Sequence, residues 1–267
     1  MPQQTTDSVR GQASELQACA TALLAAQRVV VFTGAGVSAE SGIATFRDAM
    51  TGLWSRFNAE ELATPEAFQR DPDLVWAWYE SRRRQVLQSQ PNPGHLAIAA
   101  LAQKVEHLRV VTQNVDDLHE RAGSSAVLHL HGSLFAARCF QCARPAHQGW
   151  DHGEHPAEAD RLQPPRCDAC GQAIRPGVVW FGEELPRRAL QEAFDLAEQC
   201  DVMLAVGTSG VVRPAAELPY MAKAAGATVI QVNNRLTELD DVCHHNLMGS
   251  AGDVLPRLLG LLDIASC

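Results

Sequence analysis

Five short apolar runs alternate with helical stretches along the chain, and this alternation limits the possible folds more than any other feature. The runs are typical of buried strands and span residues 29–32, 108–112, 126–130, 202–206 and 228–232. Stretches typical of helices fill most of the gaps, at 14–27, 73–88, 93–103, 186–199 and 214–225. Parallel strands need crossover connections, which are usually helices. The pattern therefore predicts an α/β fold with a doubly wound parallel sheet.

Residues 138–176 interrupt this alternation and indicate a small inserted module. The segment is rich in Cys, His, Pro and polar residues and has little periodicity. Four of the eight cysteines of the chain lie in it as two CxxC pairs, Cys139 with Cys142 and Cys167 with Cys170.

Two CxxC pairs supply the four thiolates of a tetrahedral Zn²⁺ site. A closed four-sulfur shell leaves no position for substrate, so the metal would be structural. Two redox pairs or unrelated cysteines are the alternative, but Gly171 directly after the second pair suits a tight metal-binding turn. The intervening histidines could compete as ligands, although we expect them to be solvated: His147, His152 and His155.

Charge and hydropathy limit which kinds of partner we expect the chain to bind and in which compartment we expect it. The net charge is −9 and the pI is near 5.5, which argues against docking on DNA or acidic lipid, because phosphate binding needs a positive surface. No apolar run approaches the roughly 18 residues of a membrane span, and the first residues lack the pattern of a signal peptide. We expect no direct nucleic-acid partner, no membrane association and a cytoplasmic location, although an organelle form without its presequence would look the same. The sequence does not fix the oligomeric state, and we expect a monomer.

Small residues follow two of the predicted strands. Gly34–Gly36 follows the first strand and Gly207–Ser209 follows the fourth. Glycine at a strand end lets backbone amides approach a phosphate, and open α/β sheets bind ligands at this edge. The spacing departs from GxGxxG, so a simple tight turn is an equally supported interpretation.

Polar side chains follow the second and third strands. Gln113, Asn114 and Asp116 could hold ribose hydroxyls or a carboxamide, or could cap a helix. His131 lies at the end of the third strand and shares a face with His129, because side chains alternate along a strand. A histidine can remove a proton from a hydroxyl near neutral pH, although a lone histidine at a strand end is more often structural.

Taken in order, these segments resemble the sirtuins, a family of NAD-dependent protein-lysine deacylases. The resemblance covers residues 20 to about 262 and is carried by GAGVSAESGIATFR at 34–47, QNVD at 113–116, LHGS at 130–133, the two CxxC pairs, VVWFGE at 178–183, GTS at 207–209 and Val232-Asn233. It implies a discontinuous Rossmann-type NAD domain and a small domain with a helical part and the zinc module. The NAD domain would comprise residues 14–47, 90–135 and 184–265, and the small domain residues 48–89 and 136–183.

The resemblance also implies a role for individual residues. Those that would bind NAD are Gly34, Ala35, Gly36, Phe46, Arg47, Gln113, Asn114, Asp116, Gly207, Thr208, Ser209, Asn233 and Ala251. His131 and Asn114 would be catalytic, with His131 as general base. In the family reaction, the acyl oxygen attacks the anomeric carbon of the ribose as nicotinamide leaves, and a ribose hydroxyl is deprotonated. The products are free lysine, nicotinamide and O-acyl-ADP-ribose.

The partners would be acylated-lysine proteins. Val179 to Gly182, with Phe181 between them, resembles the strand of the family that pairs with the substrate peptide. Tyr79 and Arg82 lie three residues apart on a predicted helix, where a hydroxyl and a guanidinium can clamp a carboxylate.

Together with Ala49, this Tyr-x-x-Arg pair resembles the class III sirtuins, which remove succinyl, malonyl or glutaryl groups and often acetyl. The alternative is a solvated basic face at residues 82–84 with Tyr79 packed in the small domain. Two departures affect the cofactor loop: Ala44 replaces the proline of the family's GIPxFR motif, and the loop at 48–52 is one residue longer. Asp48 adds a negative charge near a site for acidic acyl groups.

Other functions share parts of this pattern. Mono-ADP-ribosyl transfer shares the first bond-breaking step with deacylation, and an NAD-sensing zinc protein would share both binding sites. A zinc-ribbon module for nucleic acid is a third possibility, but the acidic charge argues against it.

Overall fold

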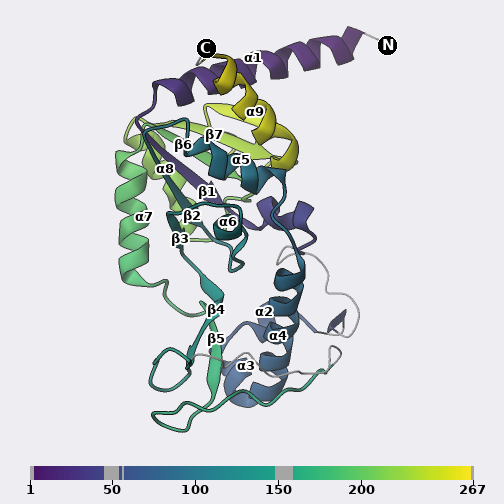
Figure 1. The fold of residues 1–267 in the computed structure, drawn as a ribbon, viewed down its shortest axis with the longest axis vertical. Coiled ribbons are helices and arrows are strands. Elements are labelled where there is room, and N and C mark those ends of the chain that lie inside the picture. The colour runs from purple at the N-terminus through teal and green to yellow at the C-terminus, as the bar shows by residue number, and fades with distance from the viewer. Residues whose placement is uncertain (1–2, 45–53, 56, 148–158, 266–267) are drawn as a thin grey trace.

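The computed structural model describes residues 3–44, 54–55, 57–147 and 159–265 (Figure 1). Its main sheet is parallel and confirms the predicted α/β fold. In spatial order, the strands are β3 (Val127–His129), β2 (His107–Thr112), β1 (Arg28–Thr33), β6 (Val202–Val206), β7 (Thr228–Asn233) and β8 (His245–Met248). The strand order reverses beside β1, which pairs with β2 on one side and β6 on the other. Ligands of open α/β sheets bind at such a switch point.

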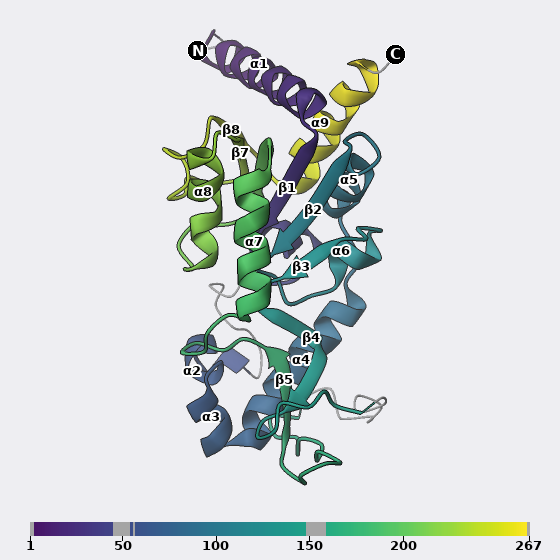
Figure 2. The same ribbon diagram turned by 90° about the vertical axis from the view of Figure 1, so that its left-hand side faces the viewer.

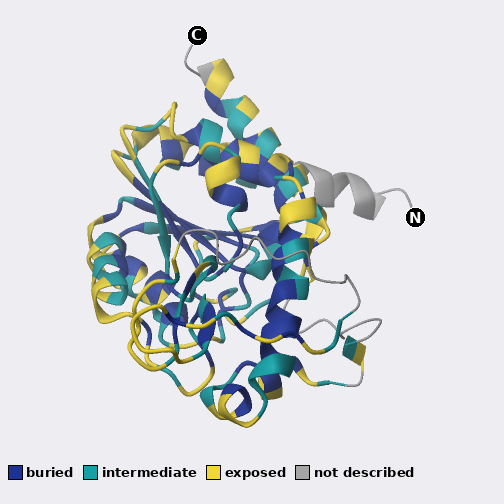
Figure 3. Cartoon of the chain, turned by 60° about the horizontal axis from the view of Figure 1, so that its bottom comes forward, coloured by how far each residue is buried: buried dark blue, intermediate teal, exposed yellow. Residues whose placement is uncertain are grey.

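Helices cover both faces of the sheet. One face packs against α1 (Gln3–Ala25), α5 (Pro93–Leu101) and α9 (Ala251–Ala265), and the other against α7 (Arg187–Gln199), the short turn η3 (Ala215–Glu217) and α8 (Leu218–Ala224). Val29 and Val31 of β1 lie in the first core, whereas Val30 and Phe32 lie in the second. A strand buried on both faces needs a continuous apolar run, which is why β1 shows no polar alternation. Figure 3 shows these buried strands between helices whose outer surfaces are exposed.

A smaller group of elements lies beyond the carboxyl ends of the strands (Figure 2). It contains the antiparallel strands β4 (Gly132–Cys139) and β5 (Ile174–Val178) and the helices α2 (Ala59–Leu62), α3 (Pro65–Arg70) and α4 (Pro72–Gln88). Its core is aromatic, with Phe68, Trp78 and Trp180 packed together. The exact residues at which two domains would divide stay a prediction.

Local sequence determines where three helices begin. Thr64, Asp71 and Asn92 each precede a proline, and each side chain accepts a hydrogen bond from a backbone N–H in the first turn of α3, α4 or α5. Proline is favoured at the first helical position because its missing N–H would have no partner there. The Asp71 cap sets the start of α4, which carries Tyr79 and Arg82.

Several elements lie outside the predicted set. α1 begins at Gln3 instead of residue 14. None of the described helices combines the length and apolarity needed to cross a membrane. Strand β8 was not predicted because it is a short edge strand with only Leu247 buried. Helix α9 was missed because Gly252, Pro256 and Gly260 interrupt its apolar pattern. Strands β4 and β5 lie at the two ends of the segment predicted as irregular.

The expectation of a strand from Val179 to Gly182 was wrong. β5 ends at Val178, and the chain then turns, with Gly182 in the left-handed region at a φ of +85°. The turn is held by Glu183, whose carboxylate accepts the Trp180 backbone N–H at 2.8 Å and pairs with Arg175. Local side-chain hydrogen bonds therefore replace a strand ladder here.

Backbone contact between two loops shapes the switch point. The Gly36 N–H donates to the Gly207 carbonyl oxygen at 2.8 Å, and the Gly34 N–H donates to Val206 O at 3.1 Å. A Cβ at Gly36 would lie 2.7 Å from that same Gly207 oxygen. Gly207 itself has a φ of +60°, which favours glycine. Glycine is therefore required by close approach of the β1 and β6 loops.

We expect Gly36→Ala to lower the free energy of unfolding by about 1–3 kcal/mol, because backbone must move to admit the methyl group. Gly260→Ala is the matched control: nothing lies within 4 Å of its added Cβ, and it sits inside α9. Alanine there should stabilise by up to about 1 kcal/mol. Urea unfolding midpoints measure both, and an unchanged midpoint for Gly36→Ala would contradict the close contact.

Candidate functional site

Polar groups from the loop after β2 and from α5 converge on Ser38, in the 3-10 helix η1 (Ala35–Ser41) that follows β1. The Ser38 hydroxyl donates to Asp116 Oδ2 at 3.0 Å and accepts from Asn114 Nδ2 at 3.1 Å. His95 Nε2 lies 3.4 Å from the same oxygen. These groups are buried, so each hydrogen bond replaces one to water. Asn114 and Asp116 are therefore held in place before any ligand binds.

Asp116 takes the capping role considered for it and also holds Ser38, whereas its binding of a ligand stays a prediction. Its Oδ1 accepts the backbone N–H of Leu118 at the start of α6 (Leu118–Arg121), as a capping residue does, and its Oδ2 accepts the Ser38 hydroxyl. Burial raises the pKa of Asp116, and the hydrogen bonds from Leu118 and Ser38 oppose this shift.

His131 is held in one orientation. Its Nδ1 lies 2.9 Å from the Gln113 carbonyl oxygen. A carbonyl can only accept, so the neutral ring carries its proton on Nδ1 and leaves Nε2 as a base. Burial lowers the pKa of His131, opposed by this hydrogen bond. The imidazole is therefore neutral at pH 7, as proton abstraction requires.

His129, two residues earlier, has the opposite charge preference. Its Nδ1 contacts the Asn114 carbonyl oxygen at 3.0 Å and its Nε2 contacts Glu120 at 2.7 Å. Burial lowers the pKa of His129, but the hydrogen bonds and the nearby carboxylates outweigh burial and raise it. His129 and His131 both face the 113–114 loop, as strand alternation predicts, and together they fix its two carbonyls.

Two further histidines lie beneath the site and are fully buried. The rings of His95 and His119 pack edge to face with centroids 4.9 Å apart, and His119 Nε2 lies 3.0 Å from Thr33 Oγ1. Burial lowers the pKa of His95 to about 4 and of His119 to about 3, so both are neutral. His119 thus contacts the end of β1, and His95 contacts Ser38.

A second chain of hydrogen bonds joins the ends of β2, β6 and β7. Gln113 Nε2 donates to Thr208 Oγ1 at 2.9 Å, and Asn233 Nδ2 donates to the Thr208 carbonyl at 2.8 Å. Ser209 follows in the same loop. Ala251 begins α9, where Glu40 accepts the next N–H, that of Gly252, at 2.8 Å. The predicted residues thus form two neighbouring groups along one edge of the sheet.

Tyr79 and Arg82 lie on α4, as predicted. Tyr79 is buried, and its hydroxyl accepts the Trp180 Nε1–H at 3.0 Å, which leaves the hydroxyl proton able to donate. The Arg82 guanidinium lies over the Trp78 ring at 5.4 Å. Burial lowers the pKa of Arg82, opposed by the charges of Tyr79 and Asp116. Arg82 is thus electrostatically coupled to the residues around Asp116. Phe46, Arg47 and Ala49 lie outside the described residues.

The four predicted cysteines form one cluster. Sulfur–sulfur distances are 3.5 Å for Cys139 to Cys170 and 3.7 Å from Cys142 to both Cys167 and Cys170. A tetrahedron with Zn–S bonds of 2.3 Å has edges of about 3.8 Å, and all four are free thiols. Burial raises the pKa of Cys139, but backbone N–H groups lower it to about 7, towards the thiolate that binds metal. The donor set and spacing fit Zn²⁺.

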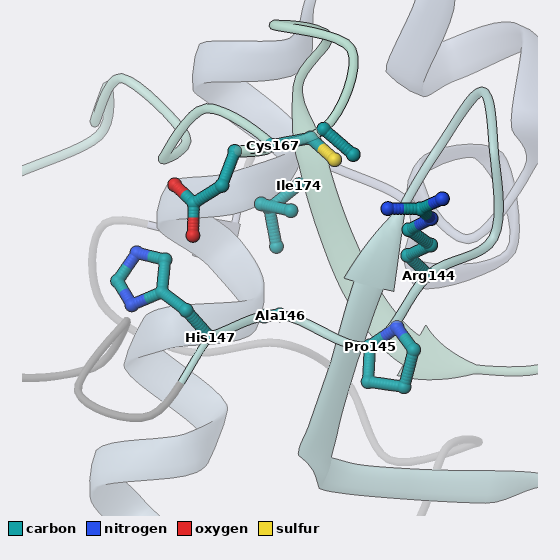
Figure 4. Close-up of a pocket in the computed structure, with 8 residues that line it drawn as sticks. Arg144, Pro145, Ala146, His147, Cys167 and Ile174 are labelled. Carbon is teal, nitrogen blue, oxygen red and sulfur yellow. The ribbon is translucent and has the colours of Figure 1, made fainter.

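Equivalent backbone turns hold the two cysteine pairs. The Ala143 N–H donates to Cys139 O at 3.1 Å, and the Gly171 N–H donates to Cys167 O at 2.8 Å. Both residues have positive φ, 58° and 70°. An open cavity lined by Arg144, His147 and Cys167 lies beside this cluster (Figure 4). It belongs to the cysteine module and not to the edge of the main sheet.

Sequence reasoning missed Ser38, Thr112 and His95 as site residues. Ser38 lies in the motif at residues 34–47, but nothing in the sequence distinguishes it from Ser41 in the same segment. Thr112 ends β2 and accepts the Asn114 N–H at 3.0 Å, a role that only the turn geometry reveals. His95 lies in a helix that carries no other site residue.

The Sir2 family model, described as "SIR2: Sir2 family", matches residues 34–214. The chain belongs to the Sir2 family. It is 57% identical over 244 residues to "NAD-dependent protein deacylase 1" of Pseudomonas aeruginosa, covering 91% of this chain and 98% of the relative. It is 50% identical to "NAD-dependent protein deacylase" of Thermococcus kodakarensis, covering 90% and 93%.

Solved Sir2 structures have the same fold. A Sir2 homologue in complex with NAD superposes with a TM-score of 0.84 at 43% identity, covering 93% of this chain and 94% of that one. Sir2Af2 bound to a myristoylated histone peptide superposes with a TM-score of 0.76 at 37% identity, covering 95% and 98%. The Rossmann-like fold of the family is therefore the fold of this chain.

Removing one cysteine ligand should release the structural metal. We expect Cys142→Ser to lose one zinc ion per chain relative to the unmodified protein, measured by elemental analysis after dialysis, and to unfold at a lower temperature. Cys243→Ser, outside the cluster, is the control and should retain its metal. Equal zinc content in the two variants would show that the cluster does not bind the ion.

Ser38→Ala should reduce kcat/KM for NAD at least about tenfold, because it leaves Asn114 Nδ2 and Asp116 Oδ2 without their buried partner. Ser41→Ala is the matched control, since the Asn92 amide that contacts Ser41 Oγ also donates to Val37 O. The control should stay within about twofold. Similar kcat/KM values for both variants would show that Ser38 does not contribute to the reaction with NAD.

Proposed function

We propose that this chain is an NAD-dependent protein-lysine deacylase, which yields nicotinamide and O-acyl-ADP-ribose. The observation that carries the proposal is His131: a neutral imidazole with its proton fixed on Nδ1 and Nε2 left as a base, beside Gln113, Asn114 and Asp116. The names of the curated relatives and the NAD complex of a homologue support it. Its substrates would be proteins carrying acylated lysines.

The chain's own residues have distinct tasks in this reaction. NAD supplies the ADP-ribosyl group that accepts the acyl oxygen. Asn114 and Asp116, held by Ser38, would bind and orient the nicotinamide and ribose side. His131 Nε2 would take the proton of a ribose hydroxyl, and its Nδ1–H bond to Gln113 O stabilises the resulting imidazolium.

The adenosine half of NAD would lie along the second group of residues. Gly34, Ala35 and Gly36 bring backbone close to Gly207, a geometry that lets amides approach phosphates. Thr208, Ser209, Asn233 and Ala251 would bind the adenosine. Phe46 and Arg47 would complete the phosphate and nicotinamide side. The zinc held by the four cysteines would be structural.

Acidic acyl groups would bind at Tyr79 and Arg82. The Tyr79 hydroxyl keeps a proton to donate, and Arg82 supplies a charge in a largely desolvated position, where an ion pair with a carboxylate is stronger than in water. Together with Ala49, which lies outside the described residues, this pair would favour succinyl and malonyl groups, with acetyl as a further substrate. Val179, Phe181 and Gly182 would line the peptide side.

The other functions receive less support. NAD sensing needs no general base, whereas His131 is held in a basic tautomer, and no motif favours mono-ADP-ribosyl transfer. We place the enzyme in the cytoplasm as a monomer, without direct contact to nucleic acid.

Turnover of one lysine peptide carrying acetyl, succinyl or no acyl group, with and without NAD, tests the proposal by mass spectrometry. We expect His131→Ala to abolish deacylation of both acylated peptides. Arg82→Met should lower desuccinylation at least about tenfold, through loss of one charged hydrogen bond, and leave deacetylation within about threefold. Deacylation should also fall as the pH drops below the lowered pKa of His131, because the protonated ring cannot act as a base.

Two control variants make the result specific. Arg84→Met changes a neighbouring arginine of the same helix, and His107→Ala changes a histidine whose side chain is 67% exposed. Both should keep both activities. Absence of NAD-dependent deacylation of any peptide would refute the proposal, and equal losses for Arg82→Met on both acyl groups would refute only the clamp.

A further inference from the structure

Helix α1 presents a line of polar side chains to the edge strand β8. Gln12, Glu15 and Cys19 are spaced by three and four residues, which places them on one face of the helix. The Gln12 amide donates to the Met248 carbonyl at 2.6 Å, and Glu15 Oε2 lies 2.5 Å from His245 Nδ1. This face is therefore docked on β8 through polar contacts.

Three of the groups at this junction are metal-binding side chains. The ligand atoms of Glu15, Cys19 and His245 all lie within 4.8 Å of one another. Thiolate, imidazole and carboxylate are the three protein ligand types of zinc. Among the described ranges, only this trio and the four-cysteine cluster bring such groups together.

We propose that Glu15, Cys19 and His245 form a second metal site, which binds a Zn²⁺-class divalent cation and joins α1 to β8. This inference goes beyond the proposed deacylase activity and does not depend on it. Three protein ligands leave a fourth position for water, as in open zinc sites.

Burial across the trio suits an ion that enters from solvent. Cys19 is fully buried among the core residues of α1, whereas the side chains of His245 and Glu15 are 24% and 45% exposed. The Cys19 sulfur thus lies on the buried side of the site and the Glu15 carboxylate on the solvent-exposed side. A cation could bind between them and keep its water ligand towards solvent.

Charge balance is also compatible with a divalent cation bound to the deprotonated Cys19 and Glu15. The thiolate and the Glu15 carboxylate together carry two negative charges, which Zn²⁺ would neutralise. Without metal, the thiol stays protonated: burial and then the Glu15 charge raise the pKa of Cys19 to about 12. Metal binding would displace the thiol proton and replace the Glu15–His245 hydrogen bond by two metal–ligand bonds.

A metal here would stiffen the strand that leads to the proposed adenosine residues. β8 pairs with β7, and Met248 lies opposite Asn233. The Gly249 N–H then donates to Asn233 O at 2.9 Å before α9 begins at Ala251. A short edge strand has few contacts of its own, so a metal link to α1 would add substantially to its stability.

Metal titration of the tag-free protein with its four-cysteine zinc in place tests the site. Co²⁺ should bind without releasing that zinc and produce the near-ultraviolet charge-transfer band of a cobalt–thiolate bond. Elemental analysis after equilibration with excess Zn²⁺ and gel filtration should give two metal ions per chain. The unfolding temperature should rise with added Zn²⁺.

Variants at the trio should remove the second ion alone. Cys19→Ser should lose the charge-transfer band, and His245→Gln should lose the second ion. The matched controls are Cys200→Ser, a buried cysteine away from the trio, and His107→Gln, an exposed histidine; both should bind two ions. Glu15→Gln changes a half-exposed side chain and should weaken Co²⁺ binding at least tenfold.

A single metal ion per chain under saturating Zn²⁺, or a Co²⁺ band that survives Cys19→Ser, would overturn the proposal. If Cys19→Ser does not fold, as circular dichroism would reveal, Glu15→Gln decides: unchanged Co²⁺ affinity refutes the site.

Discussion

Close contact between two loop backbones is the constraint on which the rest of the site depends. Gly36 and Gly207 meet at the point where the sheet order reverses, and their peptide groups are joined by a 2.8 Å hydrogen bond. A side chain at either position would separate the ends of β1 and β6. Because the ends stay together, Ser38 from one loop and Thr208 from the other remain next to the β2 loop that supplies Gln113 and Asn114.

Burial and hydrogen bonding then shift the pKa values of the histidines at this edge in different directions. In the part of the chain that the structure describes, His131 contacts no carboxylate, and desolvation lowers its pKa. His129 is also buried, yet its contact with Glu120 outweighs desolvation. The pKa values of the two histidines at this strand end therefore shift in opposite directions, because among the described residues only His129 contacts a carboxylate. The downward shift suits His131 to the proposed role of base, whereas His129 holds the loop.

The smaller group of elements is organised around Arg175. Its guanidinium stacks on the Trp180 ring at 3.4 Å and makes two hydrogen bonds to Glu183, so it fixes the turn that follows β5. Trp180 in turn donates to Tyr79 on α4. One buried ion pair thus connects the turn after β5 to the helix that carries the proposed acyl clamp. A buried charge needs such a partner, because desolvation is otherwise costly.

The sequence by itself determined the fold class and the cluster of four cysteines. Continuous apolar runs such as 29–32 can be buried only in the middle of a sheet, and two CxxC pairs are typical of one metal shell, so both predictions follow from local pattern. Tertiary structure decided what local pattern cannot contain. Edge strand β8 has too little buried surface to leave an apolar run, and Ser38 differs from Ser41 only in what lies opposite it. The turn at Val179–Gly182 depends on Arg175 and Glu183, and the junction of Glu15 with His245 joins residues 230 positions apart. Such contacts are made by folding, because a side chain's partners depend on which distant segments pack beside it.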